Sequence, residues 1–258
     1  MIQCAIRISD NQWDEWLKPV AQTQRLKNVE LDAGLLSEHR VTEALAANGI
    51  NCLVAQDIVP SQMVQLMMDA SSGTSFEDIK DAVTNVMLCG ESVNVECFTV
   101  QLLLDRFEGT DEQGFIERNA AFLKQLTTAP LEKNYSVAIQ VRQPMPTPMS
   151  KEWERAVRIC DVAKDSRIGL YVHFHPDEWA ETGTMEQFIE TCYPHLKGIC
   201  FHYDTRIGET LFDDEQAECA RRLKLLDYKG MIVFAPMVAQ SAELDKICKI
   251  AVSWADFY

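Results

Sequence analysis

The stretch Ile168-Gly-Leu-Tyr-Val-His-Phe-His175 alternates apolar and polar side chains, which is typical of a strand whose two faces meet different surroundings. The expected outward set is Leu170, Val172 and Phe174, and the expected inward set is Tyr171, His173 and His175. Residues Gly198–Asp204 alternate in the same way, with Cys200, His202 and Asp204 inward. An apolar outer face and a polar inner face near the strand end indicate a closed barrel of parallel strands covered by helices.

The whole chain supports this architecture, because eight such runs alternate with helical patterns. They are Ile2–Ile8, Asn28–Ala33, Ile50–Gln56, Val93–Val100, Tyr135–Arg142, Ile168–His175, Gly198–Asp204 and Met231–Ala235. The length of 258 residues also matches the roughly 250 of a one-domain barrel. We therefore predict a single (β/α)8 TIM-barrel domain over residues 1–258. The alternative is an open doubly wound sheet, which the strand count and the lack of G-x-G-x-x-G after the first strand disfavour.

Charge and cysteine content limit the partners. The net charge is −15 and no run of four basic residues occurs, so we expect neither nucleic acid nor an anionic membrane as a partner. The nine cysteines are odd in number and form no C-x-x-C pair, which favours reduced thiols in the cytoplasm over disulfides or a structural zinc site. No secretory signal and no stretch of about 18 apolar residues is present.

Charged and histidine side chains gather on the predicted inward face. They are Arg7, Glu30, Asp32, Glu96, Arg142, His173, His175, His202 and Asp204. Burying so many ionisable groups costs several kcal/mol each unless they pair, bind a metal or meet water. Because barrel sites lie at the C-terminal ends of the strands, this pattern predicts a site at that mouth. The alternative is a set of internal ion pairs that only stabilises the barrel.

The histidines suggest a metal. His173 and His175 share one strand face, and His202 and Asp204 have the same spacing on the next strand, about 4.8 Å away. Any divalent ion bound here would have to use His202 with His175 and Asp204, or with His173. Imidazole ligands favour zinc over manganese or magnesium. The alternative is a hydrogen-bonded histidine pair without metal.

Three segments resemble the xylose-isomerase-like TIM barrels, which include sugar isomerases, sugar epimerases and endonuclease IV. Asn28–Asp32 resembles the second strand of that family, Leu196–Asp204 the seventh, and Leu226–Val233 the approach to the eighth. The resemblance implies a divalent ion held by a carboxylate after strand five, an aspartate on strand six, a histidine on strand seven and a glutamate on strand eight. Only His202 matches, because the fifth and eighth strands end in Val141-Arg-Gln143 and Phe234-Ala-Pro236.

These observations lead to one functional hypothesis and two alternatives. We expect a divergent isomerase or epimerase that acts on a small sugar or sugar phosphate at the mouth. Its catalytic residues would be Glu96, Arg142 and His173, with Glu96 or a histidine as base and Arg142 steadying oxygen charge. Arg7, Glu30 and Arg206 would bind the substrate. The alternatives are an inactive carbohydrate-binding or interaction barrel and a metal-dependent hydrolase. A homo-oligomer is compatible with the sequence.

Overall fold

The computed structural model describes residues 2–8, 13–23, 25–69, 72–102, 104, 111–142, 151–174, 191–203, 214–236 and 241–257. Strands and helices alternate along these segments. The strands are β1 (Gln3–Arg7), β2 (Asn28–Asp32), β3 (Asn51–Gln56), β4 (Cys97–Val100), β5 (Ser136–Arg142), β6 (Ile168–Phe174), β7 (Leu196–Tyr203) and β8 (Met231–Pro236). The α-helices are α1 (Trp13–Gln22), α2 (Ala33–Leu36), α3 (His39–Ala47), α4 (Ser61–Met68), α5 (Lys80–Ser92), α6 (Glu112–Leu126), α7 (Lys151–Ala163), α9 (Asp214–Leu225) and α10 (Ser241–Phe257).

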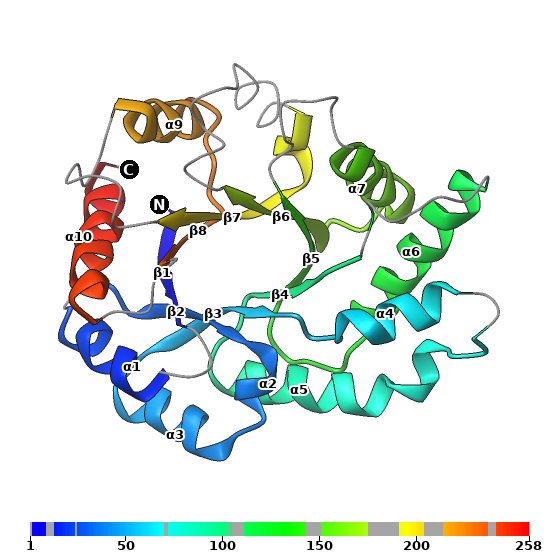
Figure 1. The fold of residues 1–258 in the computed structure, drawn as a ribbon, viewed down its shortest axis with the longest axis horizontal. Coiled ribbons are helices and arrows are strands. Elements are labelled where there is room, and N and C mark those ends of the chain that lie inside the picture. The colour runs from blue at the N-terminus through cyan, green and yellow to red at the C-terminus, as the bar shows by residue number, and fades with distance from the viewer. Residues whose placement is uncertain are drawn as a thin grey trace.

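The eight strands form a closed parallel barrel in the order β1 to β8, with β8 pairing back to β1. Figure 1 shows the ring of strands with the helices outside it. This confirms the predicted (β/α)8 barrel and excludes the open sheet. Because all strands run the same way, their C-terminal ends meet at one mouth. Among the described helices, none combines the length and the apolar composition needed to span a lipid bilayer.

The layer between strands and helices is apolar, as the alternation predicts. Leu170, Val172 and Phe174 of β6 are all buried there. On α10, the Trp254 ring lies 5.2 Å from Phe201 of β7 and contacts the neighbouring strand as well. Burial of such large side chains is the main favourable term in folding, and it fixes the outward face of each strand.

Strand β4 begins four residues later than the sequence predicts. Residues 93–95 carry two valines and were expected to open β4, but β4 begins at Cys97. Helix α5 ends at Ser92, and the chain turns through Asn94 in the left-handed conformation, with φ of 65°. Val93 and Val95 are buried in this turn rather than in a strand. Glu96 therefore precedes β4, at the N-terminal edge of the barrel.

A side chain crosses the barrel interior below the mouth. The Tyr171 hydroxyl on β6 donates a hydrogen bond to Oε2 of Glu30 on β2, four strands away around the ring. Gly198 on β7 is paired in register with Tyr171, and a Cβ atom at Gly198 would lie 2.6 Å from the tyrosine ring. The glycine therefore makes room for the ring, which separates the polar mouth from the apolar interior beneath.

Candidate functional site

The mouth contains a cavity of about 230 Å³. All of its described lining residues are polar or charged, namely Arg7, Gln56, Asp57, Gln101, Gln140, Glu152, His173 and His202. They come from β1, β3, β5, β6 and β7, from the residues directly after β3 and β4, and from the first turn of α7. Side-chain amides offer both donors and acceptors, so the cavity suits a small ligand with several hydroxyl groups.

Two histidines meet on neighbouring strands. Nδ1 of His173 lies 2.9 Å from Nε2 of His202, and the rings are 5.2 Å apart. The Sγ atom of Cys200 lies 3.7 Å from the same His202 nitrogen. One potential ligand atom from each of these three residues lies within 4.8 Å of the other two. Two imidazole nitrogens and a thiol sulfur are donors that zinc prefers, whereas magnesium and manganese favour oxygen.

Beneath the histidines lies a buried ionisable group. Glu30 is fully buried; its Oε1 lies 3.5 Å from Nε of Arg7, and its Oε2 accepts from Tyr171. Burial raises the pKa of Glu30 to about 7, although the Arg7 charge and the tyrosine hydrogen bond oppose the increase. Burial and the nearby Glu30 charge also raise the pKa of Tyr171 well above its usual value, so the phenol remains a donor.

Asp57 lies on the opposite wall of the cavity, one residue after β3. Gln140 Nε2 donates to Asp57 Oδ1 at 2.8 Å and lies 2.7 Å from Thr99 Oγ1. Burial and the neighbouring Asp32 charge raise the pKa of Asp57. Asp32 itself accepts a hydrogen bond from the Gly34 amide as the N-cap of α2. This cap is a structural role for a carboxylate that the alternation placed among the inward residues.

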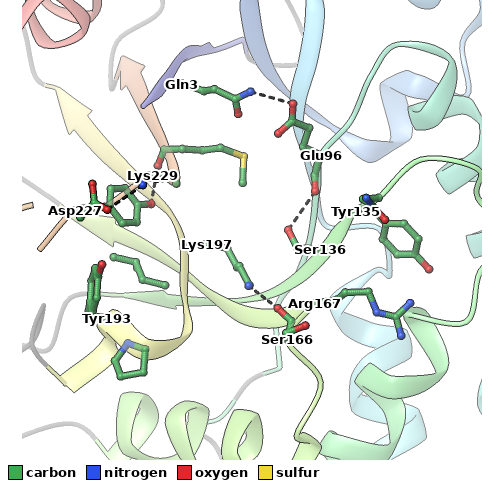
Figure 2. Close-up of a pocket in the computed structure, with 16 residues that line it drawn as sticks. Gln3, Glu96, Tyr135, Ser136, Ser166, Arg167, Tyr193, Lys197, Asp227 and Lys229 are labelled. Atoms are coloured by element: carbon green, nitrogen blue, oxygen red, sulfur yellow. Dashed lines mark hydrogen bonds and ion pairs between the residues drawn. The ribbon is translucent and has the colours of Figure 1, made fainter. Parts of the chain in front are cut away.

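Glu96 does not belong to this site. It lies at the other end of the barrel, where Gln3 Nε2 donates to its Oε1 at 3.0 Å. Figure 2 shows both residues at a hollow of about 600 Å³ that is ringed by the N-terminal ends of the strands. The prediction of Glu96 as a base beside His173 is therefore wrong. The physical reason is that Glu96 directly precedes Cys97, the first residue of β4, whereas the mouth is formed by the other end of the strand at Val100.

Solved structures with the same fold include several sugar epimerases. D-psicose 3-epimerase from Clostridium cellulolyticum H10, solved with D-tagatose, matches with a TM-score of 0.72 and 13% identity over 99% of both chains. The chain therefore shares the (β/α)8 barrel fold of this epimerase. The IolI protein, solved with a bound zinc atom, matches with a TM-score of 0.61 and 10% identity, over 98% of this chain and 96% of that one.

A solved nuclease also has this fold. AP endonuclease family 2 from Brucella melitensis has a TM-score of 0.57 and 13% identity, over 91% of this chain and 92% of that one. No protein-family profile and no curated protein matches the sequence itself. At such identities the likeness establishes the fold, whereas the chemistry depends on this chain's own residues.

The structure describes some of the predicted site residues and leaves others outside the described part of the chain. His175, Asp204 and Arg206 lie outside the described residues, and so does the side chain of Arg142. The Arg142 backbone is described and pairs in register with His173. Of the other predicted residues, Arg7, His173 and His202 line the mouth cavity, and Glu30 lies buried beneath it.

The structure adds cavity residues that the sequence reasoning did not select for the site. Asp57 was missed because it lies one residue beyond its strand, where alternation no longer predicts direction. Cys200 was placed inward but was not considered as a ligand, because a single cysteine resembles interior packing. The available signal was its i, i+2 spacing to His202, which puts both side chains on one strand face.

Proposed function

We propose that the protein binds a small carbohydrate at the barrel mouth and acts on it as a divergent isomerase or epimerase. The observation that carries the proposal is the polar cavity of about 230 Å³ in which His173 and His202 are in hydrogen-bond contact. The side-chain amides of the cavity can form hydrogen bonds with sugar hydroxyls. The Arg7 guanidinium can stabilise negative charge that develops on a substrate oxygen. The fold shared with sugar epimerases supports the same substrate class.

The reaction would move a proton next to a carbonyl group. In the 2.9 Å contact one imidazole nitrogen donates and the other accepts, so the histidine pair holds a proton that can be transferred. His173 is the proposed catalytic histidine. Arg142, His175, Asp204 and Arg206 remain proposed members of the site, because each follows or ends a strand in the sequence.

A zinc ion fits the donor set of His173, Cys200 and His202, and on binding it would take the place of the proton that the two imidazoles share. When bound, it would polarise a carbonyl oxygen of the substrate. Cys200 would have to lose its proton to bind as a thiolate, and burial raises the pKa of this thiol well above its usual value. These residues differ from the carboxylate-rich set that the family resemblance implies, since β8 ends at Pro236 without a carboxylate.

The proposed function is tested by exchange of a substrate hydrogen with deuterium from the solvent. The protein is incubated in D2O with a panel of ketohexoses and ketopentoses, and NMR follows deuterium at the carbon beside the carbonyl together with new epimers. We expect exchange with at least one sugar, and a loss of about 100-fold or more in His202→Ala. Asp81→Asn, an exposed change on α5, is the matched control.

Other outcomes separate the alternatives. Sugar binding without exchange would favour the inactive carbohydrate-binding barrel. Release of a hydrolysis product would favour the metal-dependent hydrolase. If no sugar binds and none exchanges, the proposed function is wrong.

A further inference from the structure

The chain leaves β3 through a turn that fixes the position of Asp57. Asp57 has φ of 56°, which few residues other than glycine adopt, although aspartate tolerates it better than most. The next amide, Ile58 N–H, donates to the Thr99 carbonyl at 3.1 Å, and the Ile58 and Val59 side chains are buried. Unusual backbone of this kind persists where the surroundings hold it, and it is often found at functional sites.

Gln140 holds one oxygen of this carboxylate. Its Nε2 lies 2.8 Å from Asp57 Oδ1 and 2.7 Å from Thr99 Oγ1, which links β5, the end of β3 and β4. Thr99 is fully buried, so the two hydrogen bonds of Gln140 connect Asp57 to a side chain that is fixed in the barrel. Among the described residues Asp57 Oδ2 accepts no hydrogen bond, which leaves it for a ligand in the cavity.

The histidine pair lies across the cavity from Asp57. Strands β3 and β7 are four places apart in a ring of eight, and His202 is on β7 with His173 on the adjacent β6. All three residues line the same cavity. A sugar between them would have a carboxylate on one face and an imidazole pair on the other. The fully buried Glu30 is not a rival, because it does not line the cavity; its Oε2 accepts from Tyr171 and its Oε1 lies 3.5 Å from the Arg7 guanidinium.

We infer that Asp57 is a catalytic acid–base in the proposed reaction, on which this inference rests. Asp57 takes the proton from the carbon beside the carbonyl. The C–H electron pair forms a C=C bond, and the carbonyl π pair moves to its oxygen. Return of a proton from water on the other face inverts that carbon, and Asp57 then gives its proton to solvent, without change in oxidation state. Burial, which raises the pKa of Asp57, brings the group nearer to the range suited to proton transfer.

The test compares Asp57→Asn and Asp57→Gly with the wild type. Asparagine and glycine both accept the left-handed turn, and thermal melts will show that each variant folds. We expect deuterium exchange to fall by about 100-fold or more in both variants, while the sugar Kd changes by less than about threefold. Added formate should restore part of the exchange in Asp57→Gly. Asp81→Asn is the exposed control.

The outcomes are distinguishable. Exchange at the wild-type rate in Asp57→Asn would overturn the role of Asp57 while leaving the proposed function standing. A loss of sugar binding as large as the loss of exchange would also overturn it, since it would show a binding role only. Absence of exchange in the wild type would overturn the proposed function itself.

Discussion

His173 Nδ1 and His202 Nε2 lie 2.9 Å apart on neighbouring strands, with the Cys200 sulfur 3.7 Å from the same His202 nitrogen. The strand register explains this meeting, because His173 is paired with Cys200 and His202 lies two residues further toward the mouth. Side chains two residues apart on a strand share a face. The barrel therefore presents three nitrogen and sulfur donors at one point of its rim.

We predict that the protein binds one zinc ion per chain and that His202→Ala weakens binding by about 100-fold or more. Zinc is expected to bind more tightly than magnesium or manganese, because the described donors are nitrogen and sulfur. Calorimetric titration of metal-free protein measures both comparisons. His39→Ala, which removes an exposed histidine on α3, is the control. Tight manganese binding that survives His202→Ala would contradict the assignment.

Cobalt substitution should reveal the sulfur ligand. A cobalt–thiolate bond gives a charge-transfer band in the near ultraviolet, and we expect this band in the cobalt-loaded protein. It should disappear in Cys200→Ser and persist in Cys89→Ser, whose partly exposed cysteine lies on α5. A band that is unchanged in Cys200→Ser would exclude Cys200 as a ligand.

The buried Glu30 predicts how stability depends on pH. Its pKa is about 7 in the folded protein, against an ordinary value of 4.5. Between these values the unfolded chain releases a proton that the folded protein keeps, so the contribution of Glu30 is greatest below 4.5 and is lost as pH rises through 7. At 1.36 kcal/mol per pH unit, the loss is roughly 3 kcal/mol.

Glu30→Gln should remove this dependence, and the glutamine oxygen can still accept from Tyr171. Urea unfolding at pH 5, 6, 7 and 8 measures the difference between wild type and variant. We expect the variant to gain relative stability as pH rises. Parallel pH profiles for the two proteins would show that Glu30 does not titrate in this way.

Gly198 should tolerate no side chain. In Gly198→Ala the new methyl group would lie 2.6 Å from two Tyr171 ring carbons, so the ring or the strand must move. We expect a loss of about 1–3 kcal/mol in the free energy of unfolding. Gly34→Ala is the comparison, because its nearest atom is a side-chain oxygen at 3.1 Å. Equal stability of the two variants would show that the space beside Tyr171 adapts freely.

The shared fold with an AP endonuclease makes DNA binding worth measuring. At a net charge of −15 we expect no measurable binding of duplex DNA at physiological salt. A gel-shift titration at two salt concentrations tests this. Micromolar binding that weakens with salt would contradict the prediction and favour the nuclease branch.

The sequence allowed the barrel to be predicted because each strand repeats one simple pattern. Alternation placed Tyr171 and Glu30 in the interior, where the structure finds them. It failed at Glu96, since valines 93 and 95 are buried in a turn that has strand-like composition. It could not find Asp57, because a turn with positive φ sets the direction of that side chain. Contacts between strands, such as the hydrogen bond from Gln140 to Asp57, depend on strand register, which a single sequence does not reveal.

The contact between Tyr171 and Glu30 joins strands on opposite sides of the ring. It therefore ties together two strands that the ladder of the sheet does not pair directly. Because the Tyr171 ring fills the interior at this level, the mouth cavity and the hollow around Lys197 and Ser136 are separate spaces at opposite ends of the barrel. A substitution that lines the hollow therefore makes no direct contact with a ligand in the mouth.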